Sequence, residues 1–307
     1  MQQDSAQQND SLQESLRLFR VDREPNVFSL LNVTKLEEKY KVTAPFQDDT
    51  EHADEDVSLF FPGCMFQATA PELVEIVYDW LRARKLVNTF SPKCCGNILR
   101  FSASQKKEVF QDYEEQLFER LQERMPKRII TSCPNCLYTY RALVEAHGVE
   151  VIPLSRVLLE QGLTIKAKIA EGTLDPETTY CIHDSCPDRK WGLFAESVRE
   201  LFDETSLREM KHNQKTSQCC GFGKMLNVIN PTVSEKINAT RVNEFFATDA
   251  DMLITYCFTC ISSFSPIARM GKGAHYLELL FDYRIDWDAV SDRMFNAQET
   301  CKRGIKA

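Results

Sequence analysis

Ten of the twelve cysteines in this 307-residue chain form two sets of five with nearly the same spacing. The first set follows the pattern C-x29-C-C-x37-C-x2-C and comprises Cys64, Cys94, Cys95, Cys133 and Cys136. The second set follows the pattern C-x32-C-C-x36-C-x2-C and comprises Cys186, Cys219, Cys220, Cys257 and Cys260. In both sets a glycine comes directly after the adjacent pair. This repetition indicates one structural unit used twice.

The redox state of the cellular compartment determines which chemistry these thiols favour. The sequence MQQDSAQQNDSLQESLRLFR lacks the basic start and apolar core of a secretory signal, so we expect a cytoplasmic protein. In a reducing compartment, cysteines favour metal binding or redox chemistry over structural disulfides. No run approaches the roughly 20 apolar residues of a membrane span, although attachment to a membrane through a partner stays open.

Two other chemistries compete for the cysteines. Zinc accepts thiolates, but a structural zinc site uses four tetrahedral ligands and would leave a fifth cysteine over in each set. Zinc in one of the two sites stays an alternative. The sequence CPNC at 133–136 also fits a thioredoxin-like redox motif. Its repetition as CFTC, with three more cysteines at similar offsets, favours a metal cluster instead.

The cysteines lie between predicted strands and helices. VSLFFPGC and TTYCIHDSC each contain a strand-like run before the leading cysteine, and RIITSC and DMLITYC each do so before the Cys-x-x-Cys pair. Apolar residues then recur at helical spacing, as at Leu73, Val77 and Leu81. Alternating strands and helices predict an α/β protein with two duplicated Rossmann-like lobes, parallel sheets and a pseudo-two-fold axis.

The lobes are expected at residues 57–170 and 175–290, joined by AKIAEGTLDPET, with a C-terminal tail at 291–307. Residues 1–56 hold 13 acidic and 6 basic side chains, which predicts an acidic, flexible N-terminal extension. No basic patch is interleaved with aromatic residues, so nucleic acid is not an expected partner.

Parallel sheets also predict where the thiols gather. Ligands bind such sheets at the carboxyl ends of the strands. Cys64, Cys133 and Cys136 would converge there in the first lobe, and Cys94 and Cys95 would reach in from a loop. Helix N-termini at this edge stabilise thiolates.

This pattern resembles the cysteine-rich CCG domain family, to which the B-type subunit of heterodisulfide reductase belongs, over about residues 57–285. The resemblance implies a non-cubane 4Fe-4S cluster on each five-cysteine set. It also implies that the clusters face one another and that a small-molecule disulfide is split between them. The expected partners are a ferredoxin-type iron-sulfur subunit and a flavin or membrane redox subunit. The alternative is an electron-transfer subunit of a membrane-associated respiratory dehydrogenase of the glycerol-3-phosphate, glycolate or lactate type.

Other residues are weaker candidates. His183 lies near Cys186 and could donate a proton to a departing thiolate, donate a hydrogen bond to a cluster sulfur, or simply pack at the strand end. Gly96 and Gly221 permit positive φ, either beside a cluster or in a turn. Lys93 and Arg189 could balance negative charge, bind an anionic substrate or lie in solvent. Cys181 and Cys301 have no repeat partners and are interpreted as a small buried residue and a tail residue.

Overall fold

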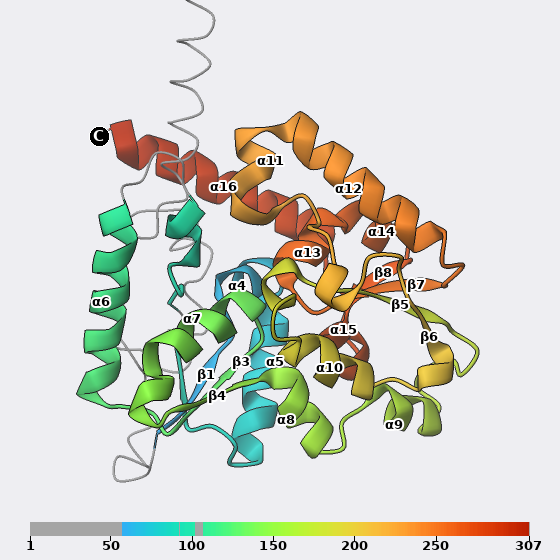
Figure 1. Ribbon diagram of the computed structural model, residues 1–307, viewed down its shortest axis with the longest axis horizontal. Coiled ribbons are helices and arrows are strands. Elements are labelled where there is room, and N and C mark those ends of the chain that lie inside the picture. Colours follow the sequence, from blue (N-terminus) through green and yellow to red (C-terminus); the bar gives the residue numbers. More distant parts are fainter. Residues whose placement is uncertain (1–56, 92, 102–106, 307) are drawn as a thin grey trace, which may run out of the picture.

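The computed structural model describes residues 57–91, 93–101 and 107–306, so the predicted acidic extension at 1–56 lies outside them. The described chain forms two lobes, each built on a four-stranded sheet (Figure 1). The strand orders are β2-β1-β3-β4 and β6-β5-β7-β8, and all paired strands are parallel. This confirms the predicted α/β class with two duplicated lobes.

The strands are short. The two central strands of each sheet were predicted from apolar runs. In the first lobe the four strands are β1 Ser58–Phe61, β2 Thr89–Phe90, β3 Arg128–Thr131 and β4 Glu150–Pro153. In the second they are β5 Tyr180–His183, β6 Leu207–Arg208, β7 Met252–Thr255 and β8 Gly273–His275. Central strands are buried on both faces, which explains their continuous apolar character.

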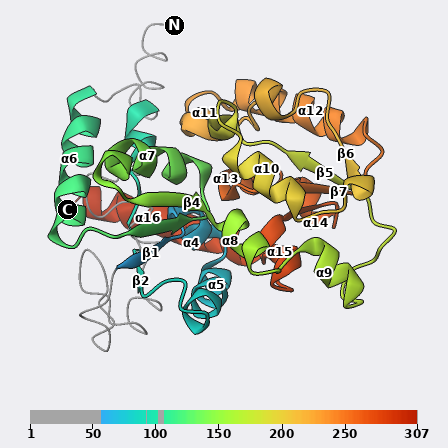
Figure 2. The ribbon, with the colours of Figure 1, turned by 60° about the horizontal axis from the view of Figure 1, so that its bottom comes forward.

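Helices lie on both faces of each sheet (Figure 2). Those between Val57 and Thr179 are α4 Cys64–Thr69, α5 Pro71–Ala83, α6 Lys107–Glu123, α7 Pro134–Val144, α8 Leu154–Glu160 and α9 Ile165–Ala170. Those after Thr179 are α10 Leu193–Glu200, α11 Leu226–Ile229, α12 Pro231–Phe246, α13 Phe258–Ser263, α14 Ser265–Arg269, α15 Tyr276–Leu280 and α16 Trp287–Lys306. None of these described helices has the length and apolar character needed to cross a membrane.

Two segments differ from their expected form. The connection expected between the lobes begins inside α9, where the Thr164 side chain accepts a hydrogen bond from the backbone N–H of Ala167 and caps the helix. The expected C-terminal tail belongs to α16, which returns to the first lobe (Figure 1). Cys301 on α16 is fully buried in a cluster with Ala68 of α4.

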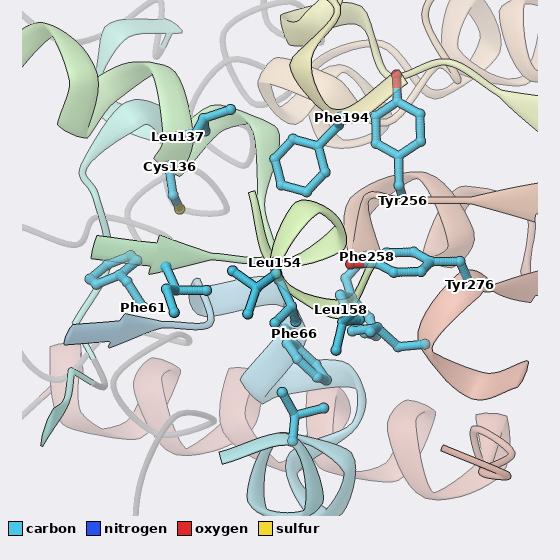
Figure 3. Close-up of a cluster of buried hydrophobic side chains, with 14 of the residues drawn as sticks. Phe61, Phe66, Cys136, Leu137, Leu154, Leu158, Phe194, Tyr256, Phe258 and Tyr276 are labelled. Atoms are coloured by element: carbon cyan, nitrogen blue, oxygen red, sulfur yellow. The ribbon is translucent and has the colours of Figure 1, made fainter. Parts of the chain in front are cut away.

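The lobes share a large hydrophobic cluster. The rings of Phe66 on α4 and Phe258 on α13 stack with centroids 4.0 Å apart, and Phe258 also stacks on His275 at 3.8 Å. Figure 3 shows Phe66 and Phe258 beside Leu158, with Phe194 and Tyr256 in the same cluster. Because both lobes contribute to this cluster, neither lobe can move away without exposing apolar area.

Replacing Phe66 with alanine tests this shared core. The change removes a fully buried ring and its stacking contact, so we expect the free energy of unfolding to fall by about 3–5 kcal/mol. Chemical denaturation of the anaerobically purified protein measures the change. The matched control is Phe246→Ala on α12, whose side chain is 46% exposed. A similar loss in both variants would contradict a shared core centred on Phe66.

Candidate metal centre

The strand order brings the cysteine-bearing loops of each lobe together. Cys64 begins α4 just after β1, and Cys133 precedes α7 just after β3. Strands β1 and β3 are neighbours, although β2 separates them in the sequence, so the crevice between their carboxyl ends is the topological switch point of the sheet. Cys186 and Cys257 occupy the corresponding positions after β5 and β7. The predicted convergence at the carboxyl ends is therefore seen in both lobes.

Each adjacent cysteine pair is shaped by the glycine that follows it. Gly96 has φ +74° and Gly221 has φ +92°, a conformation that favours glycine. The backbone N–H of Gly96 donates to Sγ of Cys94 at 3.4 Å, and that of Gly221 donates to Sγ of Cys219 at 3.3 Å. The glycines thus turn the chain and also direct a donor at the first sulfur of each pair.

The helix after each pair leaves no room for a larger residue. A Cβ added at Gly96 would lie 2.3 Å from the Tyr113 ring of α6, and one at Gly221 would lie 2.5 Å from the Ser234 carbonyl of α12. Tyr113 also donates a hydrogen bond to the carbonyl of Cys94 at 2.9 Å. Helices α6 and α12 therefore fix the position of the adjacent cysteines.

The ten thiols form one continuous series. Sγ of Cys94 lies 3.6 Å from Sγ of Cys64. Side-chain interactions then link the remaining thiols in the order Cys94, Cys95, Cys136, Cys133, Cys257, Cys260, Cys220, Cys219 and Cys186. The two thiol sets meet at Cys133 and Cys257, which are equivalent residues of the two sets. All twelve cysteines lie in the described chain, and none forms a disulfide.

Crowding and burial perturb the ionisation of these thiols. The pKa is above its ordinary value for seven of the ten: Cys94, Cys95, Cys133, Cys136, Cys186, Cys220 and Cys260. Interaction with Cys220 and then Cys257, followed by burial, raises the pKa of Cys260. Interaction with Cys186 and then Cys220 instead lowers the pKa of Cys219. Because neighbouring thiolates repel one another, all ten can ionise together only around positive charge.

A polar network anchors the leading loop of the second set. Asp188, just after Cys186, accepts hydrogen bonds from the backbone N–H groups of Phe194 and Ala195 at 3.3 and 2.7 Å. Tyr138 of the first lobe also donates to Asp188. The N-terminus of α10 and the neighbouring lobe thus hold this loop together.

Gly63 is a site residue that the sequence analysis missed. It has φ +85°, and a Cβ there would lie 3.2 Å from Sγ of Cys136 and 3.1 Å from Cβ of Cys133. Its counterpart in the second lobe is Ser185, whose Oγ lies 3.8 Å from Sγ of Cys260. Its place directly before a leading cysteine is the sequence signal that could have identified it.

His183 lies beside the second set of thiols. It is fully buried, and one of its ring nitrogens lies within 4.8 Å of Sγ of both Cys220 and Cys260. Burial, followed by the charge of Arg241, lowers its pKa to about 4, so the ring is neutral at pH 7. A neutral ring supports the hydrogen-bonding interpretation, while proton donation to substrate stays a prediction.

The remaining candidate residues differ in how deeply they are buried. Cys181 is fully buried in the core of the second lobe, as expected. Arg189 is exposed, and Lys93 is half-buried. Neither Arg189 nor Lys93 forms an ion pair with a described residue. No charged partner therefore holds either side chain beside the thiols.

The donor set fits an extended cluster better than a single ion. Each lobe supplies five soft sulfur ligands on separate loops, whereas structural zinc takes four ligands. His183, Cys220 and Cys260 could contribute to a smaller site, but that site would leave the other thiols of the lobe without positive charge. The residues present therefore fit iron–sulfur chemistry, in which several irons share the thiolates.

Substitution of Gly221 by alanine tests how the adjacent pair is positioned. Positive φ and the contact with the Ser234 carbonyl should together destabilise the protein, the contact adding about 1–3 kcal/mol. The control is Gly271→Ala, because Gly271 has φ +73° but no atom within 4 Å of an added Cβ. Thermal unfolding compares the two. Equal losses would mean that φ alone, and not the contact with α12, requires glycine.

Comparison with known proteins agrees with this geometry. The model of the "Cysteine-rich domain" family CCG matches residues 58–141 and again residues 180–265. An uncharacterised iron-sulfur protein of Methanococcus maripaludis is 27% identical over 204 residues, covering 66% of this chain and 39% of that protein.

Two further relatives are named as redox proteins. The D-type subunit of the dihydromethanophenazine:CoB--CoM heterodisulfide reductase of Methanosarcina barkeri is 25% identical, covering 54% of this chain and 42% of its own. The probable iron-sulfur-binding oxidoreductase FadF of Bacillus subtilis is 23% identical, covering 50% and 22%. The chain spans less than half the length of these relatives. With both matched regions centred on the five-thiol sets, the chain belongs to the CCG cysteine-rich domain family.

Proposed function

We propose that the chain is an iron–sulfur subunit of a heterodisulfide-reductase-type complex, similar to the B-type subunit of that enzyme. In this proposal each five-thiol set holds one non-cubane 4Fe-4S cluster. The first would be bound by Cys64, Cys94, Cys95, Cys133 and Cys136, and the second by Cys186, Cys219, Cys220, Cys257 and Cys260. The similarity to iron–sulfur oxidoreductases supports the class of cofactor.

The interaction between Cys133 and Cys257 carries the proposal of disulfide reduction. These residues belong to different lobes but meet at the junction of the two thiol sets. A disulfide needs two electrons and two protons to give two thiols. Iron–sulfur clusters, when bound, would supply one-electron transfer from each lobe. Adjacent sites therefore suit a reaction that needs two electrons at one sulfur–sulfur bond.

The protein's own residues would hold this arrangement rigid. The stacked rings of Phe66 and Phe258 fix the lobes against each other, and Gly96 and Gly221 direct N–H donors at sulfur. Such donors stabilise thiolate in a site that excludes water. The substrate would be a small thiol-derived disulfide held between the lobes.

Electrons would come from partner proteins. The sequence lacks the C-x2-C-x2-C-x3-C run of ferredoxin clusters, and GFGKML at 221–226 does not complete the G-x-G-x-x-G dinucleotide pattern. We therefore propose a ferredoxin-type subunit and a flavin or membrane redox subunit as partners. Location in the cytoplasm, or at a membrane through such a partner, belongs to the same proposal.

The test is thiol release by the chemically reduced, anaerobically purified chain. We expect about two thiols per disulfide, across a panel of low-molecular-weight disulfides, and loss of at least tenfold in rate for Cys95→Ser or Cys220→Ser. Cys301→Ser is the control, because Cys301 is a buried cysteine outside both sets.

Metal analysis accompanies each variant. The unaltered chain should hold about eight irons, and each cysteine variant should lose iron from its own lobe. Stoichiometric zinc without iron would refute the cofactor. If the clusters are intact but none of the disulfides is cleaved, disulfide reduction is wrong. Electron relay in a respiratory dehydrogenase would then be the function that remains.

A further inference from the structure

The two sites differ at the last residue of the strand that precedes each leading cysteine. Phe61 ends β1 and pairs with Thr131, whereas His183 ends β5 and pairs with Thr255. The neighbouring ring also corresponds: Phe61 meets Tyr140 edge-on at 4.6 Å, and His183 meets Phe264 edge-on at 4.9 Å. An imidazole in the second lobe therefore occupies the place of a benzene ring in the first.

Arg241 fixes how that imidazole carries its proton. Nε of Arg241 donates to Nδ1 of His183 at 3.4 Å. A guanidinium has donors only, so Nδ1 is the acceptor and the neutral ring carries its hydrogen on Nε2. Nε2 is buried and has no hydrogen-bond partner among the described residues. Because an unpaired buried donor is costly, this N–H is available to a sulfur acceptor supplied when the site is loaded.

The surroundings give the His183 ring a sulfur-rich neighbourhood. A ring nitrogen of His183 lies within 4.8 Å of Sγ of both Cys220 and Cys260. Arg241 is itself fully buried, where it pairs with Glu244 and touches Met210. This contact chain spans β5, α12 and the loop before the adjacent pair.

The first lobe has no equivalent histidine–arginine pair, although the Tyr140 hydroxyl there is also buried without a hydrogen-bond partner among the described residues. Among residues 58–141 whose burial the structure describes, no Arg, Lys or His side chain is buried. The ring that packs on Phe61 carries the Tyr140 hydroxyl, whose pKa is raised by burial and then by Cys95 and Cys136, so it stays neutral. The two thiol sets therefore have the same ligands but different electrostatic surroundings.

We propose that His183, oriented by Arg241, is a positioning residue that donates a hydrogen bond from Nε2 to sulfur at the second site and makes that site the easier one to reduce. The inference rests on the proposed function, because it concerns clusters bound by both sets. Reduction adds negative charge, and hydrogen bonds to sulfur stabilise the reduced form. If electrons arrive one at a time, the second site would then be reduced first.

Two substitutions at His183 separate this role from simple packing. His183→Phe copies the first lobe and removes the donor. His183→Gln keeps an amide N–H near the position of Nε2 and an oxygen that can accept from Arg241. Tyr140→Phe is the matched control in the first lobe. Each anaerobic, iron-loaded variant is titrated with reductant while the electron paramagnetic resonance of both sites is followed.

For His183→Phe we expect about a tenfold lower ratio of reduced to oxidised second site at a fixed potential, equivalent to about 59 mV for one electron. His183→Gln should restore most of the shift, and Tyr140→Phe should leave the second site unchanged. Comparison with Cys95→Ser, which lacks the first site, assigns the signals.

If His183→Phe keeps its full iron content and its reduction potentials are unchanged, this inference is wrong and the proposed function is unaffected. Loss of iron from the second site in both His183→Phe and His183→Gln would also overturn it, because His183 would then be needed to hold the iron rather than to tune its potential. Absence of iron from the unaltered chain would instead overturn the proposed function.

Discussion

Repulsion among crowded thiolates is the constraint on which the structure depends. Parallel strands and tight glycine turns bring ten cysteines to one place, where most of their side chains are buried. Neighbouring sulfurs raise the pKa of thiols such as Cys260, while Cys219 and Cys257 have lowered values. Positive charge at the centre would reverse this, since thiolates bind metal in their ionised form. A group of several metal ions would therefore turn this crowding into a source of stability.

Duplication explains the shape of the site, while divergence explains its asymmetry. Helix α4 meets α13, and the equivalent elements α7 and η4 (Cys186–Asp188) meet on the other side of the junction. The first contact is a stack of Phe66 on Phe258, whereas the second is polar, with Tyr138 donating to Asp188. Equivalent contacts thus hold the lobes by different forces. The same divergence puts His183 at the position equivalent to Phe61, so two similar thiol sets acquire different surroundings.

The sequence predicted the parts of the fold that repeat. The apolar runs at β1, β3, β5 and β7 are continuous because those strands are buried, and the spacing of the cysteines follows the strand ends. The outer strands were not predicted, because pairs as short as Thr89–Phe90 carry no periodicity. Helix α16 was missed, although Trp287, Met294 and Cys301 recur at seven-residue spacing.

Contacts between distant segments were beyond single-sequence reasoning. The convergence of thiols within a lobe follows from strand order, but the meeting of Cys133 with Cys257 depends on how the lobes pack. The contact of Arg241 with His183 joins α12 to β5, and nothing in the local sequence of either marks it. Gly63 shows the same limit, since its role depends on the approach of Cys136.

Anomalous X-ray diffraction at the iron edge, from crystals of the anaerobically purified protein, would locate the metal in each lobe. We expect two separate groups of about four irons, each surrounded by the five cysteine sulfurs of one lobe and adjacent at Cys133 and Cys257. Iron in one lobe only, or a single zinc ion at His183, Cys220 and Cys260, would contradict this expectation.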